Sequence, residues 1–152
     1  MTRPLSMKRA IRPGRPTTTP ERSALLGRVR QKGTAPEVVV QEMLTRLGHA
    51  YSTNERGIPG SPDVVAMDQS RAVFVHGCYW HRHPGCPASS TPKSNAEFWK
   101  EKFEANIRRD QRKVRELRKL GYRVMTVWEC QTKSADKRVR LERRLDRFFQ
   151  GA

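Results

Sequence analysis

The sequence lacks any long hydrophobic run. No stretch of its 152 residues approaches the roughly 20 consecutive apolar residues that a membrane-spanning helix needs. The basic N-terminus also lacks the apolar centre of a signal peptide. We therefore expect a protein without a membrane association, located in the cytoplasm or at the nucleoid of a bacterium. The length suits a single compact domain with its own hydrophobic core.

Acidic residues are also scarce. Only 15 Asp and Glu oppose 31 Lys and Arg, which gives a net charge of +16 and an isoelectric point near 10.9. Such a charge attracts polyphosphates, so nucleic acid is the favoured partner. Charge alone does not separate an enzyme from a basic structural protein of the ribosome. A membrane-surface role is less favoured, because the basic residues are spread over several segments instead of one amphipathic helix.

Cysteine is scarce as well, and its number is odd. The three cysteines are Cys78, Cys86 and Cys130, which argues against a disulfide framework. Thiolates in a reducing compartment bind metal more often than they form disulfides. Together with His83 these thiols make a Cys₃His set, which is typical of a structural zinc site. The alternative is a buried Cys130 with two free loop thiols. We favour zinc, because exposed paired thiols without metal are prone to oxidation.

Hydrophobic periodicity and turn residues predict an α/β domain with a sheet flanked by helices. Residues 1–20 contain four prolines and five basic residues, which indicates a flexible arm that either follows a phosphate backbone or only aids solubility. Thr34 with Glu37, and Ser94 with Glu97, are typical of capping boxes. The expected helices cover residues 21–33, 34–47, 95–120 and a last segment after Ser134, and the expected strands cover 63–67, 71–76 and 122–128. From residue 34 on, the order is α-β-β-α-β-α.

Residues 74–86, FVHGCYWHRHPGC, form the most informative segment. It holds three of the four histidines and two of the three cysteines of the chain. Packing alone gives no reason to place so many metal ligands and aromatic residues on one loop. A site that binds metal and nucleic acid does give one.

Two polar residues flank the predicted pair of strands. Asp63 begins the first strand and His76 ends the second. If the strands pair across the turn at residues 68–70, the two side chains come close together. A carboxylate beside a histidine would form a magnesium and phosphate site. The alternatives are a turn residue for Asp63 and a core histidine without a chemical role for His76.

Two further residues are candidates for proton transfer. His81 remains once His83 is assigned to zinc, and a near-neutral pKa would suit it to deprotonate water. A histidine without function is the equal alternative. Asp110 lies on the apolar stripe of the long helix, where an unpaired carboxylate is costly to bury. It should pair with a cation or a histidine or bind metal, and by composition alone an arginine is the commonest partner.

Three aromatic residues lie in basic surroundings. Tyr79 and Trp80 follow a predicted zinc ligand, and Trp99 is near the start of the long helix. Such residues can stack on bases or wedge between base pairs. The alternative, that they cover the hydrophobic core, applies to Trp99 more than to the other two.

Several short segments of the sequence together resemble one family, the very-short-patch repair (Vsr) DNA mismatch endonucleases. The resemblance spans residues 22 to about 148. The matching text is Glu37 after Thr34, PGSPDVV at 59–65, FVHGCYWH at 74–81, EFW at 97–99, residues 106–110 and WEC at 128–130. The family implies a restriction-endonuclease-like fold for residues 21–152 and cleavage of one DNA strand beside a T:G mismatch, which arises when 5-methylcytosine deaminates. Magnesium would be the catalytic cofactor and zinc a structural one.

The resemblance also implies catalytic roles. Asp63 would bind Mg²⁺ with help from the main-chain carbonyl of Val75. His81 would be the general base, oriented by Asp110. His76 would act on the phosphate or the leaving group.

Further roles follow from the same resemblance. Glu37 would support the site, and the three cysteines with His83 would bind zinc. Tyr79, Trp80 and Trp99 would form a wedge that enters the DNA from the major-groove side; Tyr79 stands where the family has phenylalanine. The partner would be duplex DNA with a T:G mismatch, bound by a monomer and followed by downstream repair proteins. The alternatives are a nickase for matched DNA in restriction or phage defence, and a non-catalytic zinc-containing DNA-binding module.

Overall fold

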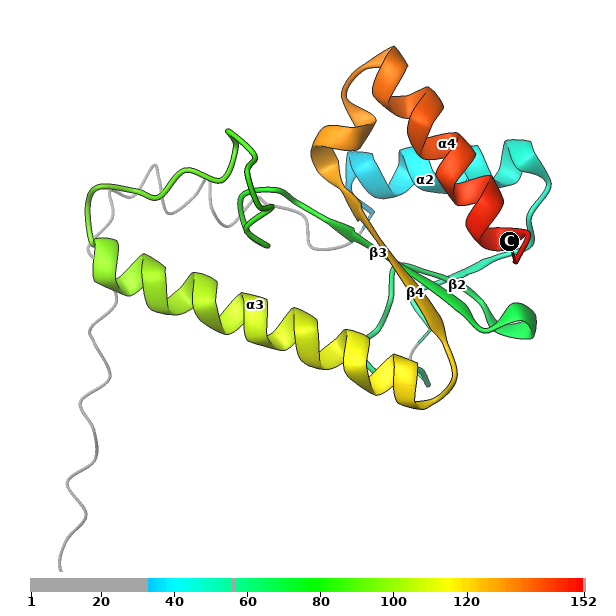
Figure 1. Cartoon of the computed structure of the whole chain (residues 1–152), viewed down its shortest axis with the longest axis horizontal. Coiled ribbons are helices and arrows are strands. Elements are labelled where there is room, and N and C mark those ends of the chain that lie inside the picture. The colour runs from blue at the N-terminus through cyan, green and yellow to red at the C-terminus, as the bar shows by residue number, and fades with distance from the viewer. Residues whose placement is uncertain (1–32, 56, 152) are drawn as a thin grey trace, which may run out of the picture.

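The computed structural model describes residues 33–55 and 57–151 and shows a four-stranded sheet with helices on both faces (Figure 1). The strands are β1 (Ser52–Thr53), β2 (Val64–Ala66), β3 (Arg71–His76) and β4 (Arg123–Trp128). The helices are α2 (Ala35–Leu47), α3 (Ala96–Lys119) and α4 (Ala135–Phe149), with short 3₁₀ turns η1 (Met67–Gln69) and η2 (Glu129–Thr132). In the order β1-β2-β3-β4, the first two pairs are antiparallel and β3 pairs with β4 in parallel. The predicted mixed sheet flanked by helices is confirmed.

Side chains alternate along the strands and so divide the core into two layers. Val73 and Val75 belong to the cluster with α2 and α4, whereas Ala72 and Phe74 pack with Leu117 of α3. Figure 1 shows α2 and α4 on one side of the sheet and α3 on the other. Because successive strand residues point to opposite faces, the residue two positions after Phe74, His76, faces the α3 side.

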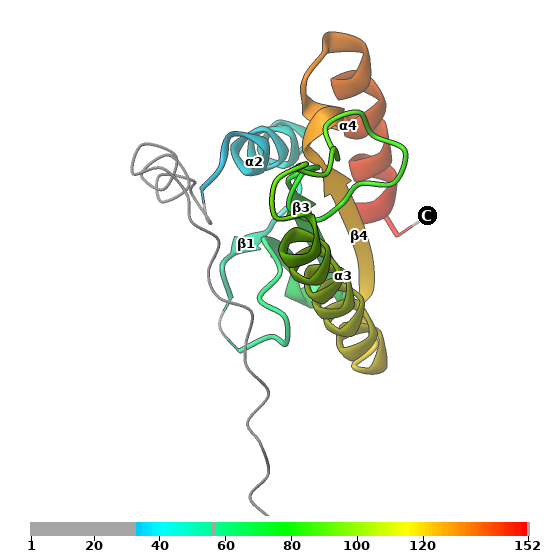
Figure 2. The ribbon, with the colours of Figure 1, turned by 90° about the vertical axis from the view of Figure 1, so that its left-hand side faces the viewer.

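Because β3 and β4 are parallel, the loop after β3 and the turn η2 after β4 start at the same end of the sheet. Parallel strands need a crossover connection, here the loop at residues 77–95 followed by α3. The register pairs His76 with Trp128, so β3 and β4 end side by side. Figure 2 looks onto this end, where the loop after β3 lies near the start of α3. This loop and η2 leave the sheet from neighbouring strand ends.

Most expected elements occur where periodicity placed them, but several details are wrong. The strand β1 was not expected, because two polar residues give no periodic signal. In the last helix, apolar periodicity predicts Val139 in the core, but this side chain is 48% exposed, while Phe149 is buried at 2%. The arm at residues 1–20 and the helix at 21–33 lie outside the described residues, apart from Gly33. In the described part of the chain no helix has the length and apolar character to cross a membrane.

Both predicted capping boxes at the starts of α2 and α3 are wrong. Thr34 is the N-cap of α2, but its side chain makes no cap bond. Instead, Oε2 of Glu37 accepts the N–H of Gly33 at 2.9 Å, one residue further back. The N-cap of α3 is Asn95, not Ser94, with φ at 55° and no side-chain cap. Side-chain capping needs an extended N-cap backbone, and this left-handed residue does not provide it.

Candidate active site and metal centre

A cleft of about 890 Å³ opens on the α3 side of the sheet. It is bordered by the start of α2, the end of β3, the loop that follows, and the middle of α3. The side chains predicted to be catalytic all line it: Glu37, Asp63, His76, His81 and Asp110. The fold therefore brings together five residues from five segments, namely α2, the position just before β2, the end of β3, the loop after β3 and α3.

A histidine–carboxylate pair lies in this cleft. Nδ1 of His81 is 2.7 Å from Oδ2 of Asp110, and both side chains are partly buried. Burial alone would raise the pKa of Asp110, but the hydrogen bond from His81 and the nearby positive charges hold that pKa below its usual value. The partner of Asp110 among the described residues is thus His81, not an arginine. The bond orients the imidazole and directs Nε2 away from Asp110.

The second histidine of the cleft is held neutral. The ring of His76 stacks on that of His81 with 3.9 Å between centroids and 7° between planes. Burial, together with the charge of His81, lowers the pKa of His76 to about 4. At neutral pH the ring is therefore uncharged. It can take part in hydrogen bonds without carrying a positive charge into the cleft.

The carboxylate of Asp63 lies beside the end of β3. Its Oδ2 accepts the N–H of Val75 at 2.7 Å. Burial, with a contribution from the charge of Glu37, raises the pKa of Asp63 to about 6, although the Val75 hydrogen bond acts in the opposite direction. The charge of Lys113 compensates the burial and the nearby Glu37 only in part, so positive charge is still lacking at this acid. A divalent cation fits at this carboxylate because it would supply that charge.

The loop before Asp63 comes close to α3. Gly60 has φ at +79°, and a Cβ at this position would lie 2.9 Å from Cβ of Lys113. Pro62 is fully buried. The glycine of the Gly-Ser-Pro-Asp segment therefore has a steric explanation. Only glycine suits both the left-handed backbone and the close approach to Lys113.

Removing the charge of Asp63 is expected to stabilise the metal-free protein. Asp63→Asn keeps an oxygen that can accept the N–H of Val75. A carboxyl group whose pKa is raised to about 6 contributes stability at low pH that is lost as the pH rises through 6. The variant should therefore melt several degrees above the parent at pH 8, corresponding to at most about 3 kcal/mol, with little difference near pH 4. The measurement is thermal unfolding in a chelating buffer. Asp68→Asn, at an exposed acid, is the control, and an equal shift at both pH values would contradict the prediction.

The three thiols and His83 form a second cluster beside the cleft. All four donor atoms lie within 4.8 Å of one another, and none of the thiols forms a disulfide. Nδ1 of His83 is 3.6 Å from Sγ of Cys78 and 3.5 Å from Sγ of Cys130. Cys86 completes the set. This donor set fits a tetrahedral metal ion with soft ligands. Cys130 is in η2, so the cluster connects the loop to the end of β4.

Arg82, which the sequence analysis did not single out, holds the same loop in place. Its guanidinium donates to the carbonyls of Tyr79, Ser89 and Ser90 at 2.7–3.2 Å. Its Cζ also lies 4.0 Å above the ring of Phe103 in α3. An arginine between two histidines is indistinguishable in sequence from a solvated charge. The structure places it as a clamp between the loop and α3.

The three predicted wedge residues form one aromatic cluster. Tyr79 and Trp80 meet edge-to-face at 5.0 Å, and Trp80 lies 6.2 Å from Trp99. Trp99 is only 6% exposed and packs on Phe103, as the core-covering alternative describes. Trp80 is half-buried, and both tryptophans line the cleft. The cluster thus has a rigid base and a more accessible tip.

Comparison with known proteins places this sequence among DNA endonucleases. The sequence model of a family described as DNA mismatch endonuclease Vsr matches residues 17–86. The chain is 42% identical to the Type II nicking enzyme V.XorIIP of Xanthomonas oryzae pv. oryzae over 74% of this chain and 83% of that protein. It is 36% identical to DNA mismatch endonuclease Vsr of Escherichia coli over 76% of this chain and 74% of that protein. The fold is similar to the catalytic domain of the homing endonuclease I-Bth0305I, with a TM-score of 0.50 and 21% identity over 78% of this chain and 97% of that domain.

Proposed function

The chain belongs to the DNA mismatch endonuclease Vsr family and is a DNA endonuclease, and we propose that it nicks one strand of duplex DNA beside a T:G mismatch. The observation that carries this proposal is the hydrogen bond between His81 and Asp110 within one cleft with Asp63 and His76. In the proposed setting a monomer acts on DNA in the bacterial cytoplasm, and repair proteins process the nick.

The cleft residues would divide the chemistry among them. His81, oriented by Asp110, would take a proton from the attacking water on Nε2, the ring nitrogen that is not bonded to Asp110. His76, neutral at pH 7, would contact a phosphate oxygen or the leaving group. Asp63, with the neighbouring main chain of Val75, would hold Mg²⁺. When bound, Mg²⁺ supplies positive charge to the scissile phosphate. The product would be a nick with a 5′-phosphate.

The ion proposed for the second cluster is zinc with a structural role. Cys78, His83, Cys86 and Cys130 supply four protein ligands. This number closes a tetrahedral shell and leaves no position for a substrate. Binding there would fix the loop that carries Tyr79, Trp80 and His81 relative to η2. The aromatic wedge and the general base would then share one rigid support.

Selectivity for a mismatch would come from the aromatic cluster. Tyr79 and Trp80 would enter the base stack, and Trp99, being buried, would support them from behind. Opening the stack costs less at a mispaired base than at a matched pair. The energy needed to deform the DNA therefore distinguishes mismatched from matched duplexes, and no hydrogen bond to every base is required.

A nicking assay tests the proposed specificity. With Mg²⁺, a duplex containing one T:G pair should be nicked at least about tenfold faster than its matched T:A control, because a saving of ~1.4 kcal/mol in unstacking corresponds to this factor. Five relatives are named Type II nicking enzymes, which favours as second candidate a nickase acting on matched DNA in restriction or phage defence. Equal rates on the two duplexes would support that candidate. Binding without nicking of either duplex would indicate a non-catalytic module.

A further inference from the structure

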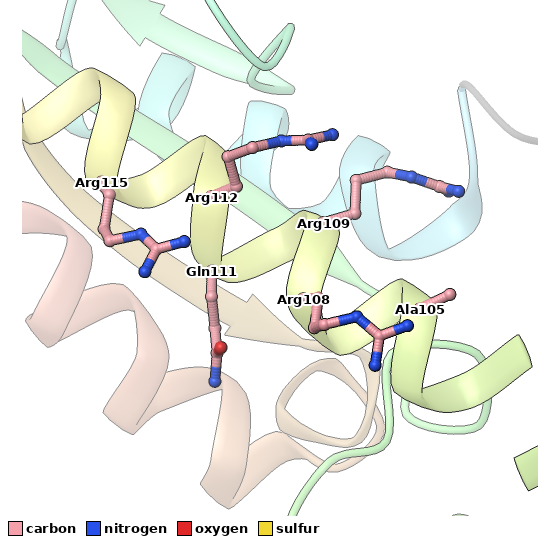
Figure 3. A pocket seen from close by; sticks show the side chains of 6 residues that line it. All are labelled: Ala105, Arg108, Arg109, Gln111, Arg112 and Arg115. Carbon is pink, nitrogen blue, oxygen red and sulfur yellow. The ribbon is translucent and has the colours of Figure 1, made fainter. Parts of the chain in front are cut away.

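The side of α3 that faces away from the sheet carries four arginines around a shallow hollow. We call Arg108, Arg109, Arg112 and Arg115 the arginine face; with Ala105 and Gln111 they line this hollow. All four arginines are exposed. Figure 3 shows the side chains of Arg109 and Arg112 directed to one side of the helix and those of Arg108 and Arg115 to the other. The arrangement offers guanidinium groups on both sides of the helix axis.

Folding does not explain the arginine face. Across residues 33–55 and 57–151, none of its four guanidinium groups has an acidic partner within ion-pair distance or a side-chain hydrogen bond. Arg46, by contrast, pairs with Glu142 at 2.9 Å. Like charges four residues apart on a helix, such as Arg108 and Arg112, are mildly destabilising. Repulsion within the arginine face thus destabilises the helix slightly, and a bound anion would remove this repulsion.

The arginine face is continuous with the catalytic cleft. Arg109 lines both the hollow and the cleft, and the next residue along α3 is Asp110, the partner of His81. From Arg108 to Arg115 the helix rises by about 10.5 Å at 1.5 Å per residue. This equals the axial length of about three phosphates on one DNA strand. A duplex whose backbone enters the cleft therefore continues past Arg109 onto the other three arginines.

We propose that the arginine face binds the sugar–phosphate backbone of the duplex beside the nicked bond. This inference rests on the proposed function only in taking DNA as the substrate of the neighbouring cleft. Contacts of this kind fix the position of a protein on the duplex but carry no base information. Each neutralised phosphate releases condensed counterions, which makes binding dependent on salt. The arginine face would thus set where the duplex lies, while the aromatic wedge detects the mismatch.

The test compares two charge-matched double variants. Arg112→Gln with Arg115→Gln removes half of the arginine face. Arg140→Gln with Arg144→Gln removes the same charge from exposed positions of α4, on the other side of the sheet. Affinity for the T:G duplex is measured by fluorescence anisotropy without Mg²⁺ from 50 to 200 mM KCl. The slope of log K against log salt should become shallower by about 2 in the α3 variant and stay within experimental error of the parent in the α4 variant.

Nicking rates separate this inference from the proposed function. In the α3 variant KM for the duplex should rise about tenfold or more, while kcat at saturating DNA stays within twofold of the parent. Equal salt slopes in the two double variants would overturn the inference even if the parent nicks T:G duplexes normally. If the parent nicks nothing and the slope still changes only in the α3 variant, the arginine face binds DNA and the proposed catalysis is wrong. Melting curves confirm that both variants are folded.

Discussion

Replacing His81 by alanine is expected to lower the nicking rate by about 10²–10⁴-fold and leave the affinity for duplex DNA unchanged. The substitution removes the group proposed to deprotonate water, and general-base catalysis contributes a factor of this size. The cleft keeps Arg109, the two tryptophans and Asp63, so binding should persist. The measurement is single-turnover nicking of a T:G duplex with Mg²⁺, next to anisotropy in EDTA. Nicking at the rate of the parent would exclude the general-base role.

The chain contains a matched control for this substitution. His49 forms a similar pair, with Nε2 2.7 Å from Oδ1 of Asp146 in α4, but it does not line the cleft. His49→Ala should therefore nick at nearly the rate of the parent. Asp110→Asn should resemble His81→Ala in the nicking rate, because an amide cannot stabilise the imidazolium that forms on His81. A loss of nicking in all three variants would point to unfolding, not to chemistry.

Replacing Cys130 by serine is expected to abolish binding of the proposed structural zinc and to weaken the fold. Cys130 supplies one of four donors within 4.8 Å of each other, and it ties η2 to the loop after β3. The loss of a structural metal site costs several kcal/mol, which for a domain of this size lowers the melting temperature by about 10 °C or more. The measurements are zinc content by mass spectrometry and thermal unfolding. Nicking should fall as well, because His81 lies on the same loop.

A chelator provides the control for this prediction. Removing metal from the parent should reproduce the melting temperature of Cys130→Ser, and the same treatment should change the variant little. A parent protein purified without zinc, together with a normal melting temperature for the variant, would reject the structural metal site. Zinc bound with equal affinity by both proteins would reject Cys130 as a ligand.

Local sequence signals predicted the elements that position the cleft. The β-branched strings around Val65 and Val73 each occur as a strand, because alternation along a strand is a short-range property. The long basic helix ends near Gly121 as expected. Local signals located the N-caps Thr34 and Ser134 but failed at the start of α3, where the N-cap backbone at Asn95 depends on how the preceding loop is held. They also failed for β1, whose two residues pair only because β2 lies beside them.

Spacing alone predicted the candidate site by residue type, whereas the pairing of His81 with Asp110 was implied only by the resemblance to the Vsr family. Cys and His with loop spacing indicated a metal site, and the fold brings distant Cys130 to it. Arg82 was missed, because its carbonyl acceptors and the ring of Phe103 come together only in the folded loop. The same limit applies to the arginine face: sequence shows an abundance of arginine but not which side chains lack a partner.

The sequence by itself determined the strand and helix periods, the donor types of a metal cluster and an excess of positive charge. These depend on residue identity and on neighbours within a few positions. Only the tertiary structure decided that Asp110 pairs with His81 at 2.7 Å and not with an arginine. It also decided that burial against His81 keeps His76 neutral. Distances between separate segments set both outcomes, because electrostatic energies and desolvation depend on the distances and burial that the fold creates.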